Sequence, residues 1–173
     1  MVALYALKRL QLDCVWWLVS PQNPLKDTKE TGEYSARFAH TEQIANHPNF
    51  KVTDLEKQIH SHNTAQTLSA LKQAMTKARF VWIMGADSFA DLDRWHNWTQ
   101  IIETLPIAVL ARPGYSVRAL SGQAALRYRK YRLSNDQAGL LATQHAPAWV
   151  FISMPLRPES STAIRQSVKA VSH

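Results

Sequence analysis

Short apolar runs separated by longer amphipathic stretches set the pattern of this chain. Residues 80–84 and 107–111 form two such runs, each of a length typical of a strand and short for a helix. The segment between them is compatible with a helix and contains Trp95 and Trp98. Two apolar strands joined by a helix are typical of a βαβ unit, whose parallel strands are buried on both faces. The pattern therefore predicts a parallel sheet.

The same pattern predicts the other elements of an α/β chain. Asn63 or Thr64 is expected to cap a helix whose buried face carries Leu68, Leu71 and Met75. Altogether we expect helices at residues 2–10, 33–45, 64–75 and 117–132, and strands at residues 14–19, 50–55 and 148–152.

Polar residues follow the two central strands. Gly85, Asp87 and Ser88 come after the first strand, and Arg112 comes after the second. In an open parallel sheet, ligands bind beyond the carboxyl ends of the strands. There a glycine lets a ligand approach the backbone, a carboxylate accepts hydrogen bonds from sugar hydroxyls, and an arginine binds phosphate as a fork. The same residues equally fit an ordinary turn in which Asp87 caps the next helix. Spacing alone leaves both interpretations open.

Composition indicates one globular domain in a reducing setting. The chain has 173 residues and is 46% hydrophobic, which suits a single domain with a sizeable core. The lone Cys14 excludes an internal disulfide and favours a cytoplasmic location. Within an apolar run, this cysteine is expected to be a buried small hydrophobe and not a nucleophile. No apolar run approaches the ~20 residues that span a bilayer, so we expect no membrane association.

The net charge of +7 favours anionic partners such as nucleotides or nucleic acid. Basic residues gather at Arg127, Arg129, Lys130 and Arg132. A solvated helix face is the preferred interpretation, because no RNA-binding signature accompanies the cluster. Nucleic acid is therefore not an expected partner. The histidines lack metal-ligand spacing with cysteines or carboxylates, so no metal site formed by the protein is predicted.

The segment GADSFADLDRWHNW, followed by IAVLARPG, resembles the bacterial nicotinate-nucleotide adenylyltransferases of the nucleotidyltransferase superfamily. The resemblance extends from about Leu4 to Arg165. It implies one nucleotidyltransferase-like domain over residues 1–173, an α/β Rossmann-like three-layer sandwich with a mostly parallel sheet. It also implies adenylyl transfer from ATP to nicotinate mononucleotide, which yields deamido-NAD and pyrophosphate in NAD synthesis. Mg²⁺ would accompany ATP, and no protein nucleophile would be required.

The resemblance also implies roles for particular residues. Trp95 would stack on the pyridine ring, Thr64 would meet the nicotinate carboxylate, and Arg37 would meet the substrate phosphate. From the residues alone, Trp95 also fits the core and Thr64 also fits a helix cap. The complete implied set is Gly85, Asp87, Ser161, Thr162 and Arg165 for ATP, and Asn23, Lys26, Arg37, Thr64, Trp95 and Arg112 for the substrate.

One motif of the family is absent from this sequence. The family opens with a strand and Gly-Gly-x-Phe-x-Pro-x-His-x-Gly-His, whose two histidines bind ATP phosphates, and no such segment occurs here. The resemblance therefore implies a missing first strand, and we expect Met1 to lie downstream of the natural start. The alternative is a catalytically inactive nucleotide-binding remnant. A third hypothesis, an RNA-binding module, predicts steeply salt-dependent binding. A homo-oligomer is compatible with the sequence.

Overall fold

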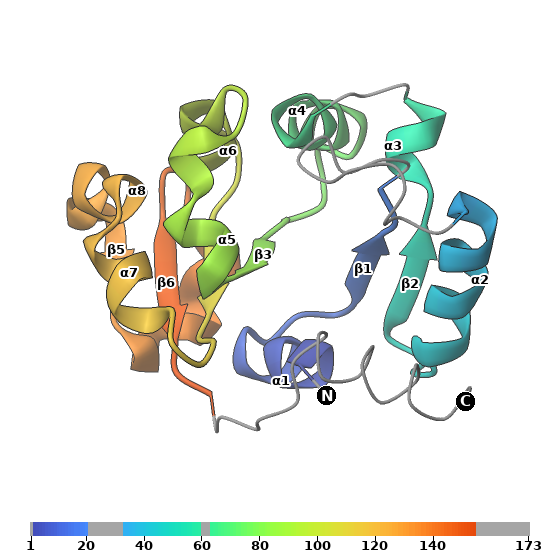
Figure 1. The fold of residues 1–173 in the computed structure, drawn as a ribbon, viewed down its shortest axis with the longest axis horizontal. Coiled ribbons are helices and arrows are strands. Elements are labelled where there is room, and N and C mark those ends of the chain that lie inside the picture. Colours follow the sequence, from blue (N-terminus) through green and yellow to red (C-terminus); the bar gives the residue numbers. More distant parts are fainter. Residues whose placement is uncertain (1, 21–32, 60–62, 155–173) are drawn as a thin grey trace, which may run out of the picture.

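The structure, a computed structural model, describes residues 2–20, 33–59 and 63–154 and contains parallel strands in two sheets (Figure 1). The strands are β1 Val15–Leu18, β2 Phe50–Thr53, β3 Trp82–Gly85, β4 Ile107–Leu110, β5 Arg132–Leu133 and β6 Trp149–Ile152. β1 pairs with β2, and the other four strands lie in the order β3-β4-β6-β5. Every neighbouring pair is parallel, which confirms the predicted parallel arrangement.

Helices connect these strands, and their termini follow local sequence signals. Asn63 caps α4, because its side chain accepts a hydrogen bond from the Gln66 N–H at 3.1 Å. The α-helices are α1 Val2–Arg9, α2 Tyr34–Ile44, α3 Leu55–Gln58, α4 Thr64–Ala74, α5 Ala86–Ala90, α6 Trp98–Thr104, α7 Ser116–Ser121 and α8 Gln123–Arg127, and the 3₁₀ helices are η1 Leu92–Arg94, η2 Arg129–Tyr131 and η3 Asn135–Thr143. Within the described ranges, no helix has the length and apolar character needed to cross a membrane.

The four-stranded sheet lies between two helical layers. Along β4, Ile107 and Val109 pack into the core beneath α4 to α8, whereas Ala108 and Leu110 pack into the core beneath α1 and η3. β6 alternates in the same way, so both strands are buried at every position. Alternating side chains therefore supply both cores, which is the three-layer α/β arrangement expected.

The two-stranded sheet stands apart from this sandwich. In Figure 1, β1 and β2 rise toward α3, whereas β6 descends toward α1, where the Tyr5 hydroxyl donates to the Ser153 carbonyl at 3.0 Å. The carboxyl ends of the two sheets thus lie on opposite sides in this view. Within the described residues β1 pairs only with β2, and β3 only with β4. The Trp16 and Phe80 rings meet across the break, with centroids 6.0 Å apart.

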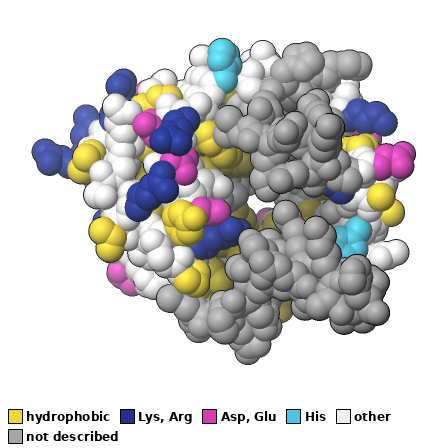
Figure 2. Space-filling view, viewed as in Figure 1, with side chains coloured by type: hydrophobic (Ala, Val, Ile, Leu, Met, Phe, Trp, Pro, Cys, Tyr) yellow, Lys and Arg dark blue, Asp and Glu magenta, His cyan; other side chains and the backbone are white. Residues whose placement is uncertain are grey.

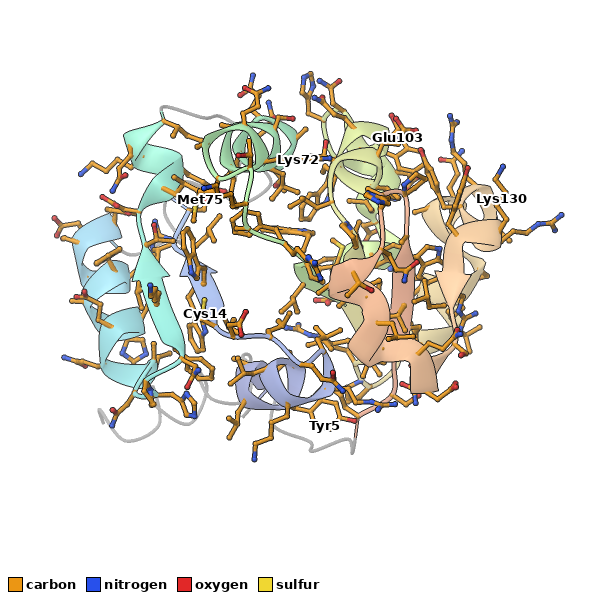
Figure 3. The ribbon with its side chains drawn as sticks, turned by 180° about the vertical axis from the view of Figure 1, so that it is seen from behind. Tyr5, Cys14, Lys72, Met75, Glu103 and Lys130 are labelled. Atoms are coloured by element: carbon orange, nitrogen blue, oxygen red, sulfur yellow. The ribbon has the colours of Figure 1, made fainter. Side chains whose placement is uncertain are left out.

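Three local predictions were wrong, each for a physical reason. The helix expected at residues 117–132 is broken at Gly122, whose extended backbone (φ −69°, ψ 162°) separates α7 from α8, and the chain then forms η2 and β5. Met75 is exposed, because α4 ends before it and its backbone is no longer helical. Cys14 is half-buried just outside β1, so it is not the core residue that its apolar context indicated. It lies beside β1 in Figure 3.

Candidate functional site

The carboxyl ends of β3 and β4 bring Gly85, Asp87 and Arg112 together. Gly85 pairs in register with Leu110, so the two strands end side by side. Gly85 is also the N-cap residue of α5, and Asp87 is the second residue of that helix. Arg112 follows β4 by two residues. The βαβ pattern in the sequence predicted this juxtaposition, because parallel strands end at the same edge.

Asp87 and Arg112 form an ion pair at this edge. Arg112 Nη1 donates to Asp87 Oδ2 at 2.8 Å, and the two side chains are 31% (Asp87) and 54% (Arg112) exposed. The other carboxylate oxygen, Asp87 Oδ1, is buried and has no hydrogen-bond partner among the described residues. The N-cap of α5 is Gly85, and Asp87 lies inside the first turn of the helix, so the interpretation of Asp87 as the helix cap is wrong. Asp87 instead bridges β3 to β4 through Arg112.

Gly85 makes room for this pair. A Cβ atom at Gly85 would nearly overlap Asp87 Oδ1 and would lie 2.9 Å from Arg112 Nε. The two side chains therefore cover the position that a larger residue would fill. Glycine is required here for the approach of these two side chains to the end of β3.

A second ion pair lies on the neighbouring helices. Arg118 of α7 donates to Asp91 at 2.5 Å, and Arg94 lies 3.8 Å from the same carboxylate. The Asp91 and Arg118 side chains are 35% and 55% exposed, close to the values for Asp87 and Arg112. Pairs exposed to this degree contribute little to stability on average. The Asp91–Arg118 pair thus has the same residue types as the Asp87–Arg112 pair and nearly the same exposure.

The other predicted residues in the described part lie on separate elements. Trp95, at the end of η1, is half-buried and packs against the core beneath α4 to α8. Thr64 begins α4, whose Lys72 reaches across to α6 and donates to the Thr104 carbonyl at 2.8 Å (Figure 3). Arg37 of α2 donates to the Ser20 carbonyl at 3.0 Å, just beyond the carboxyl end of β1. Arg37 is thus held on the β1 side of the break in the sheet.

Five predicted site residues lie outside the described residues: Asn23, Lys26, Ser161, Thr162 and Arg165.

Two further surface features lie away from the Asp87–Arg112 pair. An open hollow of about 490 Å³ lies between α1 and η3, lined among others by Lys8, Arg9 and Asp136, and no predicted site residue lines it. Figure 2 shows Lys and Arg side chains on the α7–α8 side of the molecule. Arginines of the basic cluster also pack on aromatic rings, since Arg127 lies 5.7 Å from the Trp98 ring centroid. These cations partly cover aromatic faces.

Parallel strands between helical layers, with polar residues at the strand ends, define an open α/β protein of the kind that binds ligands at the carboxyl ends of its strands. Residues 1–167 match the family model described as Cytidylyltransferase-like. The Plasmodium falciparum nicotinic acid mononucleotide adenylyltransferase complexed with APC shares the fold, with a TM-score of 0.60 at 16% identity over 94% of this chain and 76% of that chain. The same protein complexed with NaAD gives a TM-score of 0.62 at 17% identity over 90% of this chain and 69% of that chain.

Much closer sequence relatives define the family further. Proteins named "Probable nicotinate-nucleotide adenylyltransferase" from Mesorhizobium japonicum and Agrobacterium fabrum are 46% and 44% identical to this chain. Each match covers 98% of this chain, and 87% and 90% of the respective relatives. The chain belongs to the nicotinate-nucleotide adenylyltransferases within the cytidylyltransferase-like family.

Proposed function

We propose that this chain transfers the adenylyl group of ATP to nicotinate mononucleotide in NAD biosynthesis, which forms deamido-NAD and pyrophosphate. The observation that carries the proposal is 46% identity over 98% of the chain to a relative of that name. The geometry adds support, because Gly85, Asp87 and Arg112 meet at the carboxyl ends of adjacent parallel strands. Nucleotides bind at such edges in open α/β sheets.

The reaction is a direct displacement at phosphorus. A phosphate oxygen of nicotinate mononucleotide attacks the α-phosphorus of ATP, and a new P–O bond forms. The bond from the α-phosphorus to the bridging oxygen breaks, and its electron pair leaves with pyrophosphate. Since no side chain has to attack, the protein contributes by positioning the two nucleotides and neutralising their charge.

Mg²⁺ enters with ATP as part of the substrate in this proposal. Across residues 2–20, 33–59 and 63–154, no three His, Cys, Asp or Glu side chains gather closely enough to hold a metal ion. Mg²⁺ is commonly held by substrate phosphates and water with one or two protein carboxylates. In this proposal, the nucleotide phosphates carry the Mg²⁺ ion. Because both substrates are intracellular nucleotides, the proposed location is the cytoplasm.

Individual roles follow from the family and are proposals here. Asp87 accepts a hydrogen bond from the ribose of ATP beside Gly85, and Thr64 meets the nicotinate carboxylate. Trp95 stacks on the pyridine ring with its exposed part. Arg37 binds the substrate phosphate in the family-based assignment, whereas here it donates to the Ser20 carbonyl near the carboxyl end of β1, away from Asp87 (Figure 1). Ser161, Thr162 and Arg165 bind ATP, and Asn23 and Lys26 contact the mononucleotide.

Product analysis of this polypeptide tests the proposal. The chain is incubated with ATP, Mg²⁺ and nicotinate mononucleotide, and deamido-NAD and pyrophosphate are measured by chromatography. We expect equal amounts of both products, and neither product when the mononucleotide is omitted. An Asp87→Asn variant should be slower than wild type, whereas Arg118→Gln, in the matched surface pair, should equal wild type. ATP binding without product would instead identify an inactive nucleotide-binding remnant.

A further inference from the structure

We propose that the surface formed by α7, α8, η2 and β5 docks a protein segment in which carboxylates are interleaved with apolar side chains. This basic face consists of Val117, Leu126, Arg127, Arg129, Lys130 and Arg132. It includes none of the residues assigned to ATP or to the mononucleotide. The docking proposal therefore stands independently of the proposed function.

The excess positive charge of the chain is concentrated in this part of the sequence. Between Glu103 and Asp136 lie six arginines and lysines and no aspartate or glutamate. The whole chain has 20 such cations against 13 anions, so this stretch accounts for six of its seven excess positive charges. A surface of one sign attracts partners of the opposite charge and speeds their association. An acidic partner is therefore expected here.

The four cations of the basic face have no internal counterions. Of the six cations in this stretch, Arg112 pairs with Asp87 and Arg118 pairs with Asp91. The other four are exposed and form no ion pair with residues 2–20, 33–59 or 63–154. They also lie on three short elements and not on one helix, because the chain passes from α8 through η2 into β5. Their charge is available to carboxylates of a partner.

Aromatic rings hold three of these four cations in place. Arg127 lies over Trp98, Lys130 over Tyr131 and Arg132 over Trp149, at 5.7, 4.9 and 5.3 Å from the ring centroids. A side chain that already rests on a ring loses less freedom when it binds an anion. A guanidinium can also bind a carboxylate through two parallel hydrogen bonds. The basic face thus presents preorganised cations that suit carboxylates.

Exposed apolar side chains on the same face favour a protein over a nucleic acid. Val117 of α7 is 81% exposed and Leu126 of α8 is 60% exposed, and the two helices adjoin at Gly122. In Figure 2, Lys and Arg side chains lie among hydrophobic ones on the α7–α8 side. Phosphate contacts gain nothing from such side chains, whereas a protein segment buries them. Arginine is also enriched at protein interfaces and lysine is depleted, and three of the four cations are arginines.

Fluorescence anisotropy with the full chain and labelled peptides tests the proposal. One probe is a short helical peptide that carries both glutamates and leucines on one face, and the other is a polyglutamate peptide of the same charge. We expect the Glu–Leu peptide to bind about tenfold more tightly, because only its leucines cover apolar surface. Added salt should weaken both complexes. Equal affinities would show that charge alone is recognised and would contradict the proposal.

Two double variants with the same change in charge locate the surface. Arg129→Gln with Lys130→Gln removes two charges from the basic face, and Lys77→Gln with Arg79→Gln removes two exposed charges that follow α4. We expect the first double variant to bind the Glu–Leu peptide about fivefold more weakly, and the second to stay within about twofold of wild type. Urea denaturation of both variants excludes unfolding.

A matched pair of single variants tests the apolar contribution. Leu126→Ser should reduce the affinity for the Glu–Leu peptide to nearly that for polyglutamate. Ile44→Ser, which changes a side chain of similar exposure (54%) on α2, should leave the affinity unchanged. A loss of affinity only in Ile44→Ser would place the peptide on α2 and overturn the proposal.

The same measurements identify the other possible occupants of this face. Oligothymidylate or phosphatidylserine vesicles that bind more tightly than the Glu–Leu peptide would identify a nucleic acid or a lipid surface and overturn the proposal. Self-association that Leu126→Ser abolishes in sedimentation would identify a second copy of the chain. Equal losses in the two charge variants, or no binding of the Glu–Leu peptide at low salt, would also reject the proposal. Deamido-NAD formation is measured without these probes, so the proposed function succeeds or fails separately.

Discussion

The two sheets differ in how completely their strands are covered. The inner strands β4 and β6 of the large sheet are buried at every position. By contrast, β3 and β1 have one buried residue each, Met84 and Val15, and β2 has none. The indole N–H groups do not divide between the sheets in this way. Trp149 Nε1 of β6 donates to the Tyr128 carbonyl at 2.9 Å, whereas Trp82 Nε1 of β3 and Trp17 Nε1 of β1 are both buried without a partner in the described residues. Parallel sheets are stable when both faces are covered, so the larger sheet supplies most of the stability.

The helices explain this difference. α2, which accompanies the small sheet, has no buried residue, whereas α5 places Ala86, Phe89 and Ala90 in the core of the large sheet. Phe89 stacks near Trp149 with ring centroids 5.0 Å apart. A strand is covered only if a neighbouring helix presents an apolar stripe to it. The Asp87–Arg112 pair lies at the end of β3 and β4 and is therefore supported by the more stable half of the molecule.

Matched valine substitutions give the largest expected difference between the sheets. Val109→Ala, in β4, removes a fully buried side chain and should cost about 2–3 kcal/mol of unfolding free energy. Val52→Ala, in the half-buried β2, should cost less than about 1 kcal/mol. Urea denaturation followed by circular dichroism measures both values. Equal losses would contradict the division into a stable and a less stable sheet.

A substitution at Gly85 tests the comparison of the two sheets at the carboxyl-terminal edge of the large sheet. Gly85→Ala places a Cβ on the Asp87 carboxylate and near Arg112 Nε. Both are ends of flexible side chains, so stability should change by less than about 1 kcal/mol. ATP affinity should fall about tenfold, or ~1.4 kcal/mol, because the pair must separate.

Gly139→Ala is the control for the Gly85 substitution. Its Cβ would lie 3.0 Å from Nε2 of the Gln11 side chain, which is flexible and lines the hollow between α1 and η3. ATP affinity, measured for both variants by calorimetric titration, should therefore stay at the wild-type value. A loss in both variants would show that the affinity depends on general packing.

Two tyrosines give the smallest expected effect. The Tyr128 hydroxyl, on the large-sheet side, donates to Glu103 Oε1 at 2.6 Å, whereas the Tyr34 hydroxyl, on the small-sheet side, is buried without a hydrogen-bond partner in the described residues. Tyr128→Phe should cost about 0.5–1.5 kcal/mol at neutral pH, and Tyr34→Phe should be nearly neutral. Urea denaturation at pH 7 tests the pair. A larger loss for Tyr34→Phe would contradict the comparison.

The pH dependence of the same variants gives a second check. Burial, and then the hydrogen bond to Glu103, raise the pKa of Tyr128 above its usual value of 10.0. Folding therefore favours the protonated phenol, and the stability that it contributes is fully present below pH 10 and is lost as the pH rises through the raised pKa. Wild type should lose more stability than Tyr128→Phe between neutral pH and the region above pH 10. Identical pH profiles would contradict this.

The sequence was sufficient to predict the strands that are apolar throughout. The runs at residues 80–84, 107–111 and 148–152 correspond to β3, β4 and β6, because strands buried on both faces leave a continuous apolar signal. β5 was missed, since Arg132–Leu133 is two residues long, carries a charge and pairs only at the edge of the sheet. No local pattern distinguishes such a short edge strand from a turn.

The site was predictable in its location and not in its internal contacts. Parallel strands end at one edge, so the positions of Gly85, Asp87 and Arg112 beyond two apolar runs were enough to bring them together. The Asp87–Arg112 ion pair joins residues 25 positions apart, and no local pattern indicates that Gly85 leaves room for it. Side-chain directions at a strand end depend on tertiary packing, which residue spacing does not encode.

The break between the two sheets also affects how the protein behaves in concentrated solution. Within the described residues β1 and β3 each have one neighbouring strand, so each has a row of backbone amides and carbonyls that no second strand pairs. Trp16 and Trp17 add apolar rings beside that row in β1. Such edges act as templates for strands from other molecules, so aggregation is expected to grow steeply with protein concentration.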